Sequence, residues 1–373
     1  MSAAGPTVPG ARPPIGARLV DAVVDRRALP DRLLRAVIRR LLAARSRAVT
    51  AGTPAERAQR RATLLAALSE GPVTLAVEEA NRQHYEVPTG FFERMLGPRL
   101  KYSSAWWPEG VEDLGAAEEA MLERSATTAL LEDGQDVLEL GCGWGSLTLW
   151  MAERFPRSRI VAVSNSRTQR EHIESVARER GLDNVVVRTA DVSRLGVDAH
   201  TDVVRPEAFD RVVSVEMFEH VRNHRELGER IAAWLRPGGR LFVHVFAHRS
   251  DPYLFETGER GDWMARHFFT GGMMPSQDWL PSALSSLDVE SLEWIDGTHY
   301  ARTLRAWLHR LDEDASAILA LFAEDLGAPR ARVELARWRT FTIACEELFA
   351  FDGGREWGVS HLRMRRPDAR TVA

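Results

Sequence analysis

Apolar residues in the middle of the chain recur in short runs, each long enough for one buried strand. The runs lie at residues 137–140, 160–163, 185–187, 212–215 and 241–245. Segments with helical periodicity separate most of them, at residues 147–154, 167–180 and 224–235. Strands that alternate with helices favour a parallel sheet with helices on both faces. The pattern therefore predicts a doubly wound α/β domain.

The region before this alternation has a different pattern. Between residues 17 and 80, apolar positions repeat every three or four residues among arginines, as on the buried faces of helices. Helix-breaking residues occur near Pro30 and at 51–54. We expect two or three helices here, and a further helix at 115–131.

Beyond Phe246 the regular alternation stops. We expect a strand at 287–295, a long helical stretch at 303–350 and a final strand at 358–364. The last two strands are expected to form an antiparallel edge of the sheet, with the helical stretch inserted between them.

These patterns divide the chain into four parts. Residues 1–16 contain four prolines and three glycines and are expected to be a disordered arm. An N-terminal helical and cap region at 17–114 precedes the α/β domain at 115–365. The domain carries its helical insertion at about 302–351, and residues 366–373 form a tail.

Composition limits the class of protein. Hydrophobic residues make up 45% of the chain and charged residues 27%, as in a globular protein with a sizeable core. Two distant cysteines, Cys142 and Cys345, suggest neither a disulfide framework nor a cysteine-rich metal site, and we expect no metal. No apolar stretch is long enough to span a bilayer and no signal peptide is apparent, so we expect a cytoplasmic protein.

Positive charge is concentrated at the amino-terminal end. Residues 1–61 contain 13 arginines and four acidic residues, a net charge of +9, and the remaining chain carries −13. An acidic body argues against a nucleic-acid partner, because binding to phosphate backbones depends on clustered basic side chains. The basic part suits peripheral contact with an anionic membrane or partner, and a solvated helical face is the simpler alternative.

The sharpest local motif is the glycine-rich turn that follows the first predicted strand. Residues 137–145 read VLELGCGWG, a strand that runs into three glycines before a helix. Ligands of open α/β sheets bind at the carboxyl ends of strands, where glycines allow close approach. The spacing is G-x-G-x-G, and Glu139 precedes it. A carboxylate there suits a cation, such as the amino and sulfonium groups of S-adenosylmethionine, better than the diphosphate of a dinucleotide.

A second group of polar residues leaves the fourth predicted strand at the same edge. Glu216, Glu219 and His220 lie at helical spacing, so a turn of helix would gather two carboxylates and an imidazole on one side. Such a cluster allows Glu219 to orient His220, or to receive a proton or a cationic amine itself. Each residue alone has a structural alternative, as a helix-start, solvated or core residue.

Several motifs resemble the coclaurine N-methyltransferase group of the wider cyclopropane-fatty-acid synthase superfamily, over about residues 80–365. The motifs are ELGCGWGSLTLW (139–150), SNSRTQRE (164–171), VEMFEH (215–220), FFTGGMMP (268–275), HYEVP (84–88), KYS (101–103) and WRTF (338–341). The resemblance implies a Rossmann-like class I methyltransferase fold and S-adenosylmethionine as the methyl donor, with S-adenosylhomocysteine as the product. It also implies a small-molecule amine as the acceptor.

The resemblance carries specific roles for cofactor binding. Where many such enzymes have an acidic residue after the second strand, this chain has Asn165, and Asn165 and Gln169 are implied to bind the ribose hydroxyls. Asp191 is implied to accept from the adenine amine and Val192 to pack on the ring. Taken alone, Asp191 would more often cap a helix or form a turn.

The methionine end of the cofactor is the second part of that site. Tyr102 and Ser103 are implied to close over it, and a packed loop is their structural alternative. The expected lining from the glycine turn comprises Glu139, Gly141 and Gly143.

Catalytic and acceptor-binding roles also follow from the resemblance. Glu219 and His220 are the implied base pair, and Glu216 contacts the substrate. Aromatic faces suit a flat cationic amine, although aromatic residues at these spacings usually pack in cores. The expected pocket comprises Trp263, His267, Phe268, Trp338 and Phe341.

Two other functions stay open at this point. In the cyclopropane-synthase alternative, a methylated lipid carbocation loses a proton to a bicarbonate held by Glu, His, Tyr and Cys side chains or backbone. Glu219 and His244 could fill two of those places, but Ser104 stands where that branch usually has its cysteine. A silent cofactor-binding scaffold is the third alternative, and the intact acid–histidine cluster argues against it.

Overall fold

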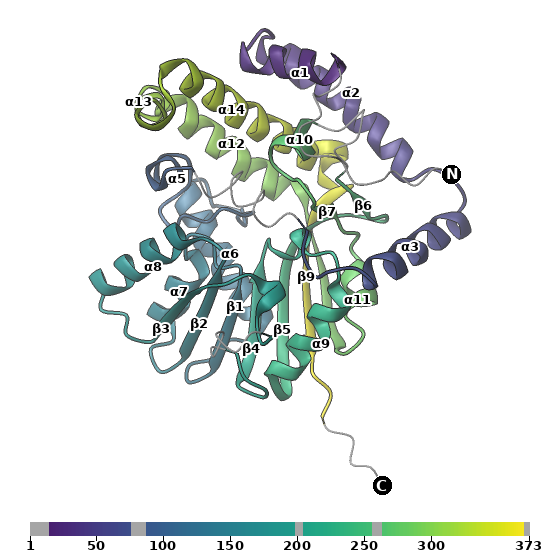
Figure 1. The fold of residues 1–373 in the computed structure, drawn as a ribbon, viewed down its shortest axis with the longest axis vertical. Coiled ribbons are helices and arrows are strands. Elements are labelled where there is room, and N and C mark those ends of the chain that lie inside the picture. Colours follow the sequence, from purple (N-terminus) through teal and green to yellow (C-terminus); the bar gives the residue numbers. More distant parts are fainter. Residues whose placement is uncertain (1–14, 76–86, 198–203, 256–262, 369–373) are drawn as a thin grey trace.

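The computed structural model describes residues 15–75, 87–197, 204–255 and 263–368. One seven-stranded sheet forms the centre, in the order β3-β2-β1-β4-β5-β9-β8 (Figure 1). Its strands are β1 (Asp136–Leu140), β2 (Arg159–Ser164), β3 (Val185–Thr189), β4 (Phe209–Val215), β5 (Leu235–His248), β8 (Asp288–Asp296) and β9 (Trp357–Arg365). Strands β1 to β5 pair in parallel, and β9 pairs antiparallel with both β5 and β8. The predicted mostly parallel, doubly wound sheet with an antiparallel edge is confirmed.

The strands are apolar on both faces because helices cover both faces. Neighbouring residues in β1 face opposite sides: Val137 packs in a cluster with α6 (Leu114–Ala129) and α7 (Ser146–Arg154). Leu138 packs in another with α9 (His224–Trp234) and α11 (Trp279–Ala283). Helix α8 (Arg167–Glu179) covers β2 and β3 through Ile173 and Ala177. The alternation of side chains along a strand thus accounts for the two-sided core.

Three helices lie between β8 and β9, where one long helical stretch was predicted. They are α12 (Gly297–Glu313), α13 (Ala315–Leu326) and α14 (Ala328–Ala350). The break between α13 and α14 falls at Gly327, whose φ of +76° is in the left-handed region, and Pro329 follows in the first turn of α14. A left-handed glycine ends one helix and a proline in the first turn starts the next.

The amino-terminal region forms three helices, where two or three were predicted. They are α1 (Ile15–Asp25), α2 (Asp31–Val49) and α3 (Pro54–Ser69), with α5 (Thr89–Met95) after them. Thr53 and Glu56 form a capping box that fixes the start of α3. Helix α1 begins within the segment expected to be a disordered arm, and residues 1–14 of that segment lie outside the described residues. So do 369–373 of the tail and 84–86 of one motif.

Short elements complete the part of the chain that the structure describes. A two-stranded sheet joins β6 (Tyr253–Leu254) to β7 (Met273–Met274), and α10 (Trp263–His267) lies between them in the sequence. Turns of 3₁₀ helix occur at η1 (Val192–Arg194), η2 (Phe218–His220) and η3 (Phe351–Gly354). None of the described helices is long and apolar enough to cross a membrane.

Ion pairs dock α1 and α2 onto α14, above the ends of the central strands (Figure 1). Asp25 pairs with Arg337, and Arg35 donates to both Glu346 and Glu347 at 2.7 Å. The acidic residues of α14 therefore neutralise part of the basic amino-terminal charge.

Arg339 is the most buried of these arginines. Its guanidinium donates twice to Asp31 and twice to Asp312, at 2.6–2.9 Å, and the residue is 8% exposed. It thereby joins α2, α12 and α14.

Replacing this guanidinium should weaken the fold measurably. Arg339→Gln should lower the free energy of unfolding by about 2 kcal/mol, because it removes charge-assisted hydrogen bonds while the two half-exposed carboxylates can be rehydrated. Arg94→Gln is the matched control: it breaks a longer contact with Asp314, 3.5 Å, between half-exposed groups, and should cost under about 1 kcal/mol. Urea denaturation measures both, and equal effects would contradict the docking role.

Candidate active site

The glycine turn after β1 creates the space for a ligand. Gly141, Gly143 and Gly145 have φ of +79°, +52° and +85°, in the left-handed region that favours glycine. A Cβ atom on Gly141 would meet Met217 at 2.7 Å, and one on Gly145 would meet Ile173 at 2.6 Å. A Cβ on Gly143 would meet no atom within 4 Å. Two glycines thus permit close packing, and Gly143 faces open space.

Two hollows adjoin this turn and share four lining residues, which are Gly141, Gly143, Gln169 and Glu216. The structure brings all nine expected cofactor residues to them. One hollow is lined by Asn165, Asp191 and Val192 together with His220. The other is lined by Tyr102, Ser103 and Glu139. Segments about 90 residues apart in the sequence therefore meet at the carboxyl ends of the parallel strands.

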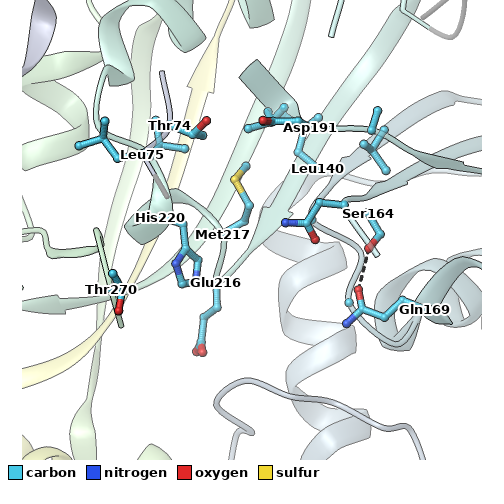
Figure 2. Close-up of a pocket in the computed structure, with 17 residues that line it drawn as sticks. Thr74, Leu75, Leu140, Ser164, Gln169, Asp191, Glu216, Met217, His220 and Thr270 are labelled. Carbon is cyan, nitrogen blue, oxygen red and sulfur yellow. Dashed lines mark hydrogen bonds between the residues drawn. The ribbon is translucent and has the colours of Figure 1, made fainter. Parts of the chain in front are cut away.

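Uncharged polar groups line the side formed by β2 and α8. The Ser164 hydroxyl donates to the Gln169 amide oxygen at 2.7 Å, on the opposite side of Met217 from Glu216 and His220 (Figure 2). Asp191 lines the hollow and also caps η1 by accepting the Ser193 N–H at 2.8 Å. Asp191 therefore caps a helical turn, as its structural alternative predicted, and also lines the site.

Glu139 is a buried carboxyl with few partners. It is 2% exposed, and the Thr148 hydroxyl donates to it at 2.5 Å. Burial raises the pKa of Glu139 to about 8, because removal from water penalises the anion. An amino cation beside Glu139 would restore the ionised form. This carboxyl therefore fits the amino group of S-adenosylmethionine. Sequence reasoning assigned Thr148 no role, because the glycine turn and not the following helix α7 indicated the ligand site.

Glu216 and Glu219 occupy different local structures. Helical spacing predicted one turn of helix for both, but η2 begins at Phe218 and Glu216 precedes it with a φ of +47°. The difference arises where the chain leaves β4: Met217 packs against Gly141 at a distance that only glycine allows. Glu216 consequently lies outside η2.

Three donors hold the Glu216 carboxylate. Tyr300 donates its hydroxyl at 2.6 Å, the Ser104 N–H donates at 3.1 Å, and His244 Nε2 lies 3.3 Å away. Burial raises the pKa of Glu216 to about 7, against the lowering effects of Tyr300 and Lys101. Tyr300 lies on α12 and Lys101 before Tyr102, and sequence reasoning assigned neither a role. No local pattern pointed to Tyr300, whereas Lys101 stood out as the single lysine of the chain.

Two neutral histidines support this arrangement. Burial holds the pKa of both His244 and His361 well below the usual value. Their rings meet at 2.9 Å between His361 Nε2 and His244 Nδ1. If the His361 Nε2–H donates, His244 keeps its own proton on Nε2 and donates it to Glu216.

Glu219 has fewer partners than the other two carboxyls. It is 2% exposed, and its Oε2 atom has no hydrogen-bond partner among the residues that the structure describes. Burial raises the pKa of Glu219 well above the usual value, and the neighbouring Glu216 raises it further. The next residue, His220, is half-buried and lines the hollow beside Glu216 (Figure 2). A protonated, buried carboxyl and an imidazole thus lie next to each other in the chain.

The expected acceptor pocket is packed as a core in this structure. Phe268 stacks on Phe341 with 4.1 Å between ring centroids, and Trp338 and Trp263 contact Phe268. His267 binds Asp21 of α1 at 3.0 Å. None of these five residues lines the two hollows at the glycine turn. The acceptor contacts of all five residues therefore stay a prediction. The four aromatic residues other than His267 pack in the core, their structural alternative, whereas His267 is half-buried.

Comparison with known proteins agrees with this geometry. The family model described as "Mycolic acid cyclopropane synthetase" matches residues 74–353. An (S)-coclaurine N-methyltransferase of Thalictrum flavum subsp. glaucum is 33% identical over 91% of this chain and 92% of the relative. A cyclopropane-fatty-acyl-phospholipid synthase of Escherichia coli (strain K12) is 30% identical over 61% of this chain and 55% of that protein.

A solved structure extends the likeness to three dimensions. The crystal structure of a coclaurine N-methyltransferase bound to N-methylheliamine and SAH has a TM-score of 0.88 with this chain at 31% identity, and covers 94% of this chain and 99% of that one. The resemblance seen in the motifs is confirmed. This chain belongs to the mycolic acid cyclopropane synthetase family and is an S-adenosylmethionine-dependent methyltransferase.

Proposed function

We propose that this chain methylates the nitrogen of a small-molecule amine. The observation that carries the proposal is the set of groups that bind the Glu216 carboxylate. Tyr300, His244 and the Ser104 N–H are the types of group expected to hold bicarbonate in a cyclopropane synthase, and here they bind a carboxylate of the chain itself. Relatives named as N-methyltransferases over most of this chain support the same choice.

The nine residues around the glycine turn are assigned to the cofactor. Bound S-adenosylmethionine supplies an activated methyl group on a sulfonium. Glu139 would hold its amino group, Tyr102 and Ser103 would enclose its methionine end, and Asn165 and Gln169 would bind its ribose. The adenine contacts and the remaining lining come from Asp191, Val192, Gly141 and Gly143.

The base pair Glu219–His220 prepares the acceptor for attack. An alkylamine is mostly protonated at neutral pH and must lose a proton before its lone pair can displace the sulfur. A cationic amine beside Glu219 favours the ionised carboxylate, because it opposes the desolvation that keeps this group protonated. Glu219 or His220 can then take the proton, and Glu216 contacts the amine. Trp263, His267, Phe268, Trp338 and Phe341 would form the acceptor pocket after local rearrangement.

Lipid cyclopropanation is the alternative function. It would require another site for bicarbonate, because the three groups that hold Glu216 are already engaged. A scaffold that only binds the cofactor is a further alternative. It would have no use for the buried Glu219 carboxyl, whose desolvation costs free energy.

We also propose a peripheral contact between the amino-terminal helices and an anionic lipid surface. Six of the large exposed apolar side chains lie on α1 and α2: Leu19, Val20, Val23, Leu33, Val37 and Leu41. On α2 the three apolar residues recur every fourth position beside exposed arginines, among them Arg32, Arg40 and Arg47. Like charges would face each other if two copies of α2 paired, whereas anionic headgroups complement them.

The cofactor site can be tested with a pair of matched glycine variants. Gly143→Val should abolish calorimetric binding of S-adenosylhomocysteine, since the new side chain enters the hollow. Gly181→Val is the control, because Gly181 has a similar φ of +67° and equally open surroundings but lies beyond α8, away from the hollows. Binding by a folded Gly143→Val protein would exclude the assigned site.

Base catalysis predicts a characteristic pH dependence. His220→Ala should lower turnover of an accepted amine by a factor of roughly 10² to 10⁴ with little change in cofactor affinity. The defect should shrink as pH rises towards the pKa of the amine, because free base then forms without help. His309→Ala, at an exposed site paired with Glu313, should have no effect. A pH–rate series on both variants measures this, and a constant ratio would leave His220 only an orienting role.

Lipid contact can be measured by vesicle co-sedimentation. Leu33→Ser combined with Leu41→Ser should weaken binding to phosphatidylglycerol vesicles more than about tenfold, because two leucines no longer insert. Val289→Ser, an exposed site on β8, is the control. Binding should be weaker to phosphatidylcholine vesicles and at high salt. Absence of vesicle binding would overturn the proposal. So would a wild-type protein that is a dimer if the double substitution makes it a monomer.

A further inference from the structure

Lys101 is chemically exceptional in this chain. Of 49 basic residues, 48 are arginines and Lys101 is the single lysine. It is also buried, with 3% exposure, whereas basic side chains are almost never fully buried unless they are paired. Arginine is used at every other basic position of the chain, but not at this one.

The surroundings of Lys101 suit a compact cation. Its ammonium donates to the Ser103 hydroxyl at 2.5 Å and to the Ser104 carbonyl at 2.8 Å. A guanidinium is larger and planar, and presents five donors that would all need partners. Two acceptors in a buried space therefore match an ammonium better than an arginine side chain.

The same short segment reaches Glu216. The Ser104 N–H donates to Glu216 Oε1 at 3.1 Å, while Lys101, Tyr102 and Ser103 line the hollow assigned to the cofactor. Lys101 thus holds the carbonyl group of Ser104, the residue whose N–H binds Glu216. It connects the segment before α6 to the turn after β4.

Charge links the two residues as well. The acidic groups that face Lys101 are Glu216 and Glu118, whose carboxylate accepts the Gly97 and Arg99 N–H groups. His244 and His361 also face it. Glu216 is itself faced by Tyr300, His244 and Glu219. The histidines are neutral. Among the described residues, Lys101 is therefore the cation that compensates Glu216.

We propose that Lys101 is a positioning residue that acts as the counter-ion of Glu216 and keeps this carboxylate ionised and fixed beside the reacting groups. This inference rests on the proposed function for the role of Glu216 towards an amine. Without the ammonium, Glu216 would take up a proton near neutral pH, and Glu219 would no longer experience a neighbouring anion. The charge that the site offers to a cationic acceptor would then fall.

The shifted titrations limit the working range of the pair. Burial lowers the pKa of Lys101 to about 8, and burial raises the pKa of Glu216 to about 7. Protonation of Glu216 at lower pH and deprotonation of Lys101 at higher pH each remove one of the two opposite charges. Turnover of the wild type should accordingly pass through a maximum between these limits.

A double-mutant cycle on stability tests the pair without any acceptor. Lys101→Met should lower Tm by about 5 °C or more, because the buried Glu216 must then either stay charged without a counter-ion or take up a proton. Glu216→Gln keeps the shape, since its amide can accept from the Ser104 N–H and donate to the Tyr300 oxygen. Combined with Lys101→Met, it should recover at least half of that loss. A double variant no more stable than Lys101→Met, whether both fold or neither does, would overturn the proposal.

Turnover separates a charge role from simple packing. Lys101→Met should lower kcat about 10²-fold with a smaller change in KM, as expected for a displaced catalytic group, and should move the acid limb of the pH profile upward. An unmoved acid limb would reduce Lys101 to packing and overturn the proposal. Absence of wild-type turnover on every amine would refute the proposed function instead, and the stability cycle would still decide the pairing.

Discussion

Three carboxyl groups are buried where β1 and β4 end, and the rest of the site depends on how each one is stabilised without water. Glu139 receives one hydroxyl, Glu216 receives three donors and a nearby ammonium, and Glu219 keeps an oxygen without a partner among the described residues. A buried anion is costly unless it is paired. The least compensated carboxyls are consequently those that gain most from an incoming cation, and the donor and the acceptor of an N-methylation are both cationic.

The same comparison separates two chemistries within one family. A lipid-modifying member needs a small anion in its site to remove a proton after methyl transfer, whereas an amine must lose its proton before transfer. In this chain a glutamate side chain takes up the hydrogen bonds of a tyrosine, a histidine and a backbone N–H. This fixed carboxylate can attract and orient a cation.

The helices around the sheet repeat this principle of compensation. Arginines of α2 bind the acidic end of α14, and aspartates of α1 and α2 bind arginines of α10 and α14. The aromatic cluster lies beneath these contacts, with Phe268, Phe341 and Trp338 packed together. Because α10, α13 and α14 also surround a separate cavity of about 310 Å³, lined in part by His267 and Phe268, space for rearrangement adjoins the expected acceptor residues.

The sequence by itself predicted the sheet and the glycine turn, and the nine residues that it assigned to the cofactor line the two hollows. Short apolar runs, helical periodicity and the glycine spacing are local properties, and the carboxyl ends of parallel strands meet at one edge whatever the packing details. Only the tertiary structure decided that Glu216 lies outside η2, and that Tyr300 and Lys101 stabilise its carboxylate. It also decided that the predicted helical stretch is divided into three helices. Contacts such as that between Glu216 and Tyr300 join residues 84 positions apart. They depend on the angle at which α12 crosses the strand ends, and no periodicity in either segment records that angle.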